Sequence, residues 1–290
     1  MVNGFFNVWK PEGISSHEAV MRLRRVIGQQ KVGHAGTLDP AAAGVLPMAV
    51  GECTRLLPFI NFNVKVYRAT VRIGTLTDSG DRDGRTVARS AVLPLPPEQL
   101  RWAAKWLTGT IWQIPPQVSA LKNGGRRHYH TVRQGGVVWP TPRRVEVASI
   151  GDIQLDQDGW SFVAEVSSGT YVRALVRDWG YLLGMAAHLG ALVRLRAGPF
   201  TRDGASSLAD IESRSHSWQC FLDPWQTYFD PRGRELNSEQ ARLVSHGDPK
   251  ALEVLGEETP GVVALMRGGR LLALVEGPPW RYRAVFEGGI

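Results

Sequence analysis

The segment 33–47, GHAGTLDPAAAGVLP, carries a single carboxylate, that of Asp39, in a stretch of small residues. Aspartate before proline and three alanines is typical of a helix start, with Asp39 as the N-cap and Pro40 in the first turn. A carboxylate held at a turn beside glycines can also be approached closely by a ligand. The residues alone favour the helix start, and a role in chemistry is compatible with it.

Two other polar side chains allow both a structural and a chemical interpretation. Tyr67 lies in the alternating segment 64–73, where a tyrosine is more often a core aromatic with a satisfied hydroxyl. Arg173 lies in the run GTYVR at the start of a helical pattern, where an arginine can equally contact a phosphate. Neither residue is assigned a function by its surroundings alone.

The sequence offers no pattern for a metal or a cofactor. The acidic run TDSGDRDG lacks the glutamate that ends a twelve-residue calcium loop, and carboxylates beside glycine commonly form an ordinary turn. Two cysteines and seven scattered histidines make no zinc pattern, and there is no nucleotide-binding glycine motif. We therefore expect an activity without metal or cofactor.

The elements that must position these residues are short strands and helices in irregular order, which favours an α+β fold over a doubly wound one. Ser15 or Ser16 is predicted to cap a helix with Val20, Leu23 and Ile27 on one side. Strands are predicted over 64–73, 145–150 and 161–166, and helices from 97 to about 109 and over 171–183.

A domain boundary is predicted in the run DPWQTYFDPRG, residues 223–233. Its two Asp-Pro steps and its glycine are typical of a turn-rich linker rather than a core element. The boundary separates residues 1–230 from a small β-rich unit, 231–290, which would be marginally stable alone. In that unit Asn237 is expected to cap a short helix, and Gly268 and Gly269 to join two apolar strands.

The net charge of +7 and the pI near 9.7 suit a polyanionic partner. Residues 1–230 contain 26 basic and 19 acidic side chains, whereas residues 231–290 contain 8 of each, so the whole excess lies in the first part. A basic stretch over 122–144 is the main candidate for backbone phosphates, with a solvated loop as the alternative. Its candidates are Lys122, Arg126, Arg127, Arg133, Arg143 and Arg144.

The motif around Asp39 resembles, nearly letter for letter, the catalytic motif of the TruB-type pseudouridine synthases. Further motifs of that family follow in order over roughly residues 5–200: Lys10-Pro11, Tyr67-Arg68, Asp78 and Asp81, the run SALK at 119–122, and GTYVR at 169–173. The resemblance implies an α+β pseudouridine-synthase fold, with a central, mainly antiparallel mixed sheet flanked by helices and loops. It also implies a small C-terminal PUA-like β domain and a mobile thumb over about 122–144.

The resemblance also implies the roles of the site residues. Asp39 would be the nucleophile, Arg173 its ion-pair partner, and Tyr67 the residue that stacks on the target base. His34 would fill the space left by the flipped base, and Leu192 would form part of the pocket wall. The structural alternatives are a histidine ring packed at a turn and a leucine of the core. Further substrate contacts are expected from Lys10, Gly36, Asp81 and Tyr171. Attack on the base or on the ribose is left open.

The function implied is the isomerisation of uridine 55 in the T loop of tRNA to pseudouridine after base flipping. The enzyme is expected to be a cytoplasmic monomer that needs no guide RNA and no obligate protein partner. No apolar run approaches the roughly 18 residues of a membrane span. Two alternatives remain: a tRNA-folding protein that uses the same cleft, and a glycosidase-like hydrolase, for which the sequence names no second acid beside Asp39.

Overall fold

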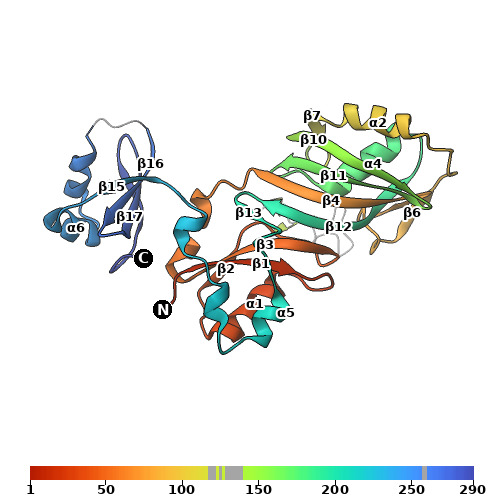
Figure 1. Ribbon diagram of the computed structural model, residues 1–290. Helices are drawn as coiled ribbons and strands as arrows, with labels where there is room; N and C mark the ends of the chain where they lie inside the picture. Colours follow the sequence, from red (N-terminus) through yellow and green to blue (C-terminus); the bar gives the residue numbers. More distant parts are fainter. Residues whose placement is uncertain (117–121, 124–125, 128–139, 257–259) are drawn as a thin grey trace.

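The computed structural model describes residues 1–116, 122–123, 126–127, 140–256 and 260–290. Two sheets dominate it: a ten-stranded mixed sheet and a four-stranded sheet formed by the C-terminal residues (Figure 1). Helices and loops flank the large sheet, so the α+β class expected from the sequence is confirmed. Within the described residues, no helix has both the length and the apolar character needed to cross a bilayer.

The large sheet is mainly antiparallel. Among the described strands, parallel pairing joins β14 to β1 and β12 to β3, and the other pairs of this sheet are antiparallel. In spatial order it consists of β14 (Ser206–Ser207), β1 (Gly4–Lys10), β3 (Ala42–Val50), β12 (Ala187–Ala197), β4 (Val64–Ile73), β11 (Gly159–Ser167), β10 (Arg143–Asp156) and β7 (Gly109–Gln113), with β2 (Val32–His34) on β3 and β13 (Phe200–Thr201) on β12.

Strand β3 contradicts the helix that the residues after Asp39 suggest. It lies between β1 and β12, and eight of its nine residues are buried. Alanine's helix propensity is worth less than 1 kcal/mol per residue, so burial between two partner strands outweighs it. Gly44 shows how close the neighbour lies: its φ is +116°, and a Cβ there would be 2.2 Å from the Arg194 carbonyl oxygen. The N-cap role predicted for Asp39 is therefore wrong.

The helices expected from the sequence are present. Helix α1 (Ser16–Ile27) begins after Ser15, whose hydroxyl accepts a hydrogen bond from the Glu18 N–H. Helices α2 (Pro97–Trp106) and α4 (Val172–Leu182) pack near β10 and β12, and α5 (Leu208–Ser213) lies against α1 (Figure 1). Their apolar faces meet the sheet in one core, whose largest side chains include Trp160 and Trp179.

Shorter elements complete the first 230 residues. They are β5 (Thr75–Thr77) paired with β6 (Thr86–Arg89), β8 (Lys122–Asn123) paired with β9 (Arg126–Arg127), and the 3-10 turns Gly51–Arg55, Leu57–Phe59, Trp218–Phe221 and Trp225–Thr227. The β5–β6 hairpin matters for the site, because its loop carries the acidic run that includes Asp81.

The C-terminal sheet has the order β15 (Arg232–Glu235), β16 (Gly261–Arg267), β17 (Arg270–Gly277) and β18 (Arg281–Val285). Asn237 caps α6 (Ser238–Ser245) through a reciprocal capping box with Gln240, and a 3-10 turn follows over Pro249–Leu255. Gly268 and Gly269 join β16 to β17 with φ values of +55° and +78°. The capped helix and the glycine hairpin expected here are confirmed.

The segment 223–233 differs from its prediction as a linker outside the core. Trp225 and Phe229 are buried in an apolar cluster that also contains Phe5 and Val45 of the large sheet and Leu274 of the small one. Asp223 pairs with Phe5 through two backbone hydrogen bonds. The Asp-Pro steps do make turns, but the aromatic side chains between them join the two sheets.

Candidate active site

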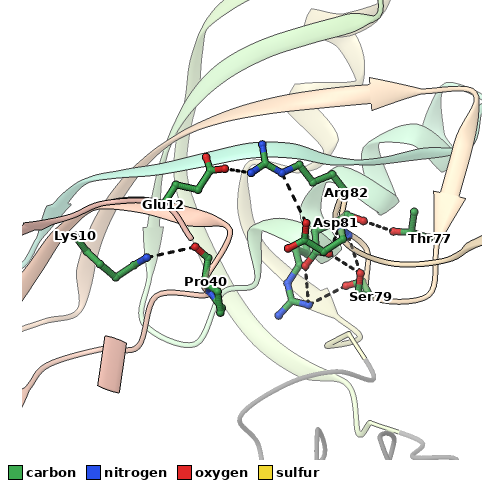
Figure 2. A network of polar contacts seen from close by, with 9 residues as sticks. Lys10, Glu12, Pro40, Thr77, Ser79, Asp81 and Arg82 are labelled. Carbon is green, nitrogen blue, oxygen red and sulfur yellow. Dashed lines mark hydrogen bonds and ion pairs between the residues drawn. The ribbon is translucent and has the colours of Figure 1, made fainter. Parts of the chain in front are cut away.

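The backbone around Asp39 is fixed by hydrogen bonds from residues far away in the sequence. The buried Ser16 hydroxyl donates to the Leu38 carbonyl at 2.9 Å and accepts from the Leu38 N–H at 2.8 Å. The Pro40 carbonyl accepts from the Gly13 N–H at 2.8 Å and lies 3.5 Å from Lys10 Nζ (Figure 2). The loop is thus held on both sides of Asp39, whose side chain is 47% exposed.

One buried guanidinium joins two carboxylates at this loop. Arg173 lies in the first turn of α4, and its side chain is only 8% exposed. Its Nη2 is 3.1 Å from Asp39 Oδ2, and its Nη1 is 3.4 Å from Asp81 Oδ2. The same Nη1 donates to the Ser79 carbonyl at 2.8 Å. A nearby guanidinium both orients a carboxylate and favours its charged form.

Asp81 is held as a hydrogen-bond acceptor. Its Oδ1 accepts from the Ser79 hydroxyl at 2.6 Å and from the Asp83 N–H at 3.2 Å, and its side chain is 15% exposed. Together with Arg173, these groups surround the Asp81 carboxylate with hydrogen-bond donors. A glycosidase needs a second carboxyl group that donates a proton to the leaving group, whereas the contacts of the Asp81 carboxylate among the described residues are all with donors.

A pocket opens beside the Asp39 carboxylate. The charged residues Asp39, Asp81, Arg82 and Arg173 line it together with an apolar wall of Ala41, Ala42, Leu189, Gly190, Ala191 and Leu192. Arg82 extends across from the β5–β6 loop and forms an ion pair with Glu12 of the loop after β1 (Figure 2). The pocket therefore combines one half-exposed carboxylate with an apolar side.

Three other predicted site residues, Tyr67, Leu192 and Tyr171, differ in their surroundings. Tyr67 of β4 is 8% exposed and belongs to the same apolar cluster as Leu38 and Ala42. Leu192 lines the pocket. Tyr171 is the residue before α4, and its N–H donates to the Gln113 side chain at 2.8 Å.

Burial lowers the pKa of both Lys10 and His34. Lys10 is fully buried, and its Nζ donates to the Pro11 and Ile14 carbonyls at 2.8 Å each. Burial lowers the pKa of Lys10 to about 8 even though Asp39 acts in the opposite direction. Burial, followed by Arg194 and His17, lowers the pKa of His34 below its ordinary value, so its ring is neutral at pH 7. Gly36, two residues further along, is exposed with a φ of +74°.

The structure describes only part of the basic stretch 122–144. Arg143 and Arg144 lie at the start of β10, with Arg144 exposed and Arg143 half-buried. For Lys122, Arg126 and Arg127 the backbone forms the short β8–β9 hairpin, and Arg133 lies outside the described residues. Their contact with RNA stays a prediction.

Four residues of this region were not assigned by the sequence: Ser16, Lys65, Arg82 and Arg194. In the sequence Ser16 is a candidate helix cap, and Arg82 lies inside the acidic run, where no motif marks it. Arg194 lies in the apolar alternation of β12 and is fully buried. Only its position in the sheet brings it to the Asp39 loop, where its Nη2 donates to the Gly36 carbonyl at 2.9 Å.

Comparison with known proteins identifies the family. Residues 24–172 match the family model described as "TruB family pseudouridylate synthase (N terminal domain)". The tRNA pseudouridine synthase B of Geobacter sulfurreducens is 43% identical over 279 residues, covering 95% of this chain and 91% of that protein. The chain belongs to the TruB family of pseudouridylate synthases. The resemblance seen in the motifs is thereby confirmed, and the chain is an isomerase.

Other relatives of this TruB-family synthase agree. The tRNA pseudouridine synthase B of Moorella thermoacetica is 44% identical over 215 residues, covering 73% of this chain and 70% of that protein. A solved Cbf5-Nop10-Gar1 complex contains a chain with a TM-score of 0.71 and 25% identity, covering 94% of this chain and 78% of that one. The pseudouridine-synthase fold implied by the resemblance is confirmed.

Proposed function

We propose that this TruB-family synthase converts uridine 55 in the T loop of tRNA to pseudouridine, with Asp39 as the nucleophile. The observation that carries the proposal is the ion pair between Asp39 Oδ2 and Arg173 Nη2, which leaves a half-exposed, charged carboxylate at the mouth of a pocket. The names of the relatives, tRNA pseudouridine synthase B, support tRNA as the substrate.

The reaction needs nothing beyond the residues of the chain. The bond between N1 of uracil and C1′ of the ribose breaks, and a bond forms between C5 and C1′. The proton on C5 leaves as N1 gains one, so substrate and product are isomers and no electron is gained or lost. A positioned carboxylate can form the covalent intermediate by adding to either the base or C1′. Arg173 holds the Asp39 carboxylate in place for that step through their ion pair.

The surroundings of Asp39 suit a flipped base. The apolar wall of Leu189, Ala191 and Leu192 is proposed to face the uracil, and Tyr67 on the strand beside β12 is proposed to stack on it. The neutral ring of His34 is proposed to fill the space that the base leaves in the RNA. Arg173 and Asp81 fix the position of Asp39 rather than contact the RNA backbone.

Flipping a uridine out of a folded loop costs roughly a few kcal/mol, which contacts with the RNA must offset. We propose that the basic side chains of the stretch 122–144 supply phosphate contacts, and that residues 231–290 form a second RNA-binding unit beside the catalytic unit 1–230. We also propose that the protein acts as a monomer without a guide RNA or a protein partner.

The test uses purified protein, unmodified tRNA and a chelator, and it maps pseudouridine by position for wild type and Asp39→Asn. We expect conversion at uridine 55 by the wild type and none by the variant. Conversion at another uridine would overturn the site, and conversion by Asp39→Asn would overturn the nucleophile.

The same experiment decides the remaining alternatives. Tight tRNA binding by the wild type without any product would favour the tRNA-folding role. Release of free uracil would favour the hydrolase. A requirement for an added RNA or protein before product appears would overturn the proposal that the protein acts alone.

A further inference from the structure

Two cationic side chains meet at the exposed turn that precedes Asp39. Arg194 of β12 and Lys65 of β4 both extend towards Gly36: a Cβ placed on Gly36 would lie 3.4 Å from Arg194 Nη1 and 3.6 Å from Lys65 Nζ. The two cations therefore converge on one point beside a residue that has no side chain. The corner formed by Gly36, Lys65 and Arg194 is called the Gly36 corner below.

Arg194 is fixed in place but incompletely paired. Its Nε donates to the Val45 carbonyl at 2.7 Å and its Nη2 to the Gly36 carbonyl at 2.9 Å, and the residue is fully buried. Its Nη1 has no hydrogen-bond partner among the described residues. A guanidinium normally uses its donors on carboxylates or phosphates, so this free donor points to a group that the chain itself does not supply.

The charges at the Gly36 corner also indicate an anionic ligand. Among the ion pairs of the described residues, none gives Lys65 or Arg194 a carboxylate partner. Burial, and then the nearby Arg194, lower the pKa of Lys65 to about 8. Two neighbouring cations without an acid are costly in a folded protein, and an anion bound between them would remove that cost.

The position of the Gly36 corner relates it to the active site. Gly36 precedes Asp39 by three residues on the same loop, and Arg194 follows Leu192 of the pocket wall by two residues on β12. Gly36 is exposed and Lys65 is half-buried, so the corner lies at the surface of the protein. A ligand that fills the pocket and carries an anion a short distance away would engage both at once.

We propose that the Gly36 corner binds one backbone phosphate adjacent to the target uridine. The proposal rests on the proposed function, and it assigns Lys65 and Arg194 to substrate binding. Lys65 makes the direct contact, and Arg194, whose unpaired Nη1 is covered in this structure, adds positive charge behind it. A phosphodiester matches the corner because it is a permanent anion that follows the base along an RNA strand.

The experiment compares Lys65→Met with Lys31→Met. Lys31 is a matched control, because it immediately precedes β2, the strand that leads to the Asp39 loop, but already forms an ion pair with Glu52. We expect Lys65→Met to weaken binding of unmodified tRNA about tenfold, the equivalent of one charge-assisted hydrogen bond. The slope of log K against log salt concentration should decrease in magnitude by about 0.9 or slightly less, the contribution of one phosphate contact. Lys31→Met should keep both values, and Lys65→Arg should restore most of the affinity.

The contact is then located with synthetic RNA in which a neutral methylphosphonate replaces either phosphate flanking the target uridine. At one of the two positions, wild type and Lys31→Met should lose about tenfold in affinity, while Lys65→Met loses little more. Equal losses for wild type and Lys65→Met at both positions would overturn the proposal.

Failure of the inference and failure of the proposed function look different. If the wild type forms no pseudouridine at uridine 55, the proposed function fails, because the flanking phosphates are then not those of the target nucleotide. If it forms pseudouridine there but Lys65→Met binds and titrates with salt like Lys31→Met, only the assignment of the Gly36 corner fails. Thermal unfolding of each variant shows that the comparison is made on folded protein.

Discussion

Arg173 and Arg194 are both almost inaccessible to solvent, yet their surroundings differ in charge. Arg173 lies between the carboxylates of Asp39 and Asp81, and its Nη1 also donates to the Ser79 carbonyl. Arg194 donates to two carbonyls, keeps one nitrogen unpaired and has Lys65 as a cationic neighbour. One arginine balances the acids of the site, whereas the other leaves positive charge uncompensated.

The comparison separates two tasks within one site. A cation paired inside the protein fixes the position and charge of a side chain, and the folded state gains from it. A buried cation without an internal partner lowers stability, and it makes physical sense where a ligand brings the opposite charge. Removing a residue from the first group should therefore reduce turnover and stability together, and removing one from the second should reduce binding while raising stability.

The largest effect is expected for Arg173→Met. Loss of the guanidinium leaves Asp39 and the nearly buried Asp81 without their counter-charge, so turnover should fall at least about a hundredfold while tRNA affinity changes less than about threefold. The free energy of unfolding should fall by about 3 kcal/mol. Single-turnover rates, binding curves and denaturant unfolding measure the three quantities.

The control is Arg177→Met, one turn further along α4, where Arg177 pairs with Asp178 and donates to the Ile114 carbonyl. It should keep its turnover. Equal losses of turnover and affinity in Arg173→Met would show that Arg173 mainly holds RNA.

A smaller effect is expected for Ser16→Ala, because the variant removes both hydrogen bonds to Leu38 but leaves the Asp39–Arg173 ion pair. The loosened loop should lower kcat about tenfold with little change in KM. The adjacent Ser15→Ala is the matched control: it removes the α1 cap and should cost about 1 kcal/mol of stability without changing kcat. A kcat that is equally lowered in both variants would contradict a positioning role for Ser16.

The smallest effect is expected for the free energy of unfolding of Lys65→Met, which should rise, whereas that of Arg173→Met should fall. Because the pKa of Lys65 falls from 10.5 to about 8 on folding, the folded state disfavours the charged lysine at every pH below 8. The variant should be more stable than wild type by about 1 to 2 kcal/mol at pH 7, after allowance for solvent screening. The difference should shrink between pH 8 and 10.5, as the folded wild type loses the proton that the unfolded chain still holds.

Urea unfolding at several pH values measures this difference. A Lys65→Met protein that is less stable than wild type at pH 7 would show that Lys65 is already satisfied within the fold, which would remove the contrast with Arg173.

The sequence predicted what local pattern and family motif control. Helix α1, the capping box of α6 and the glycine hairpin at Gly268 follow from local rules, and the proximity of Asp39 to Arg173 follows from the resemblance. The strand after Pro40 was missed, because alanines read as helix formers until β1 and β12 are known to flank them. Ser16, Arg82 and Arg194 were missed because their partners lie 22, 70 and 149 residues away. Such contacts are set by the tertiary arrangement of the elements, which no local pattern specifies.

The most direct test of the account is the single-turnover rate of pseudouridine formation at uridine 55 by Asp39→Asn, with Asp81→Asn beside it and tRNA affinity measured on the same preparations. Both substitutions keep the size of the side chain and one oxygen that can accept from Arg173. The account predicts that Asp39→Asn binds tRNA normally and forms no product, whereas Asp81→Asn is slowed but active. Product from Asp39→Asn, or complete loss in Asp81→Asn alone, would contradict the assignment of Asp39 as the nucleophile.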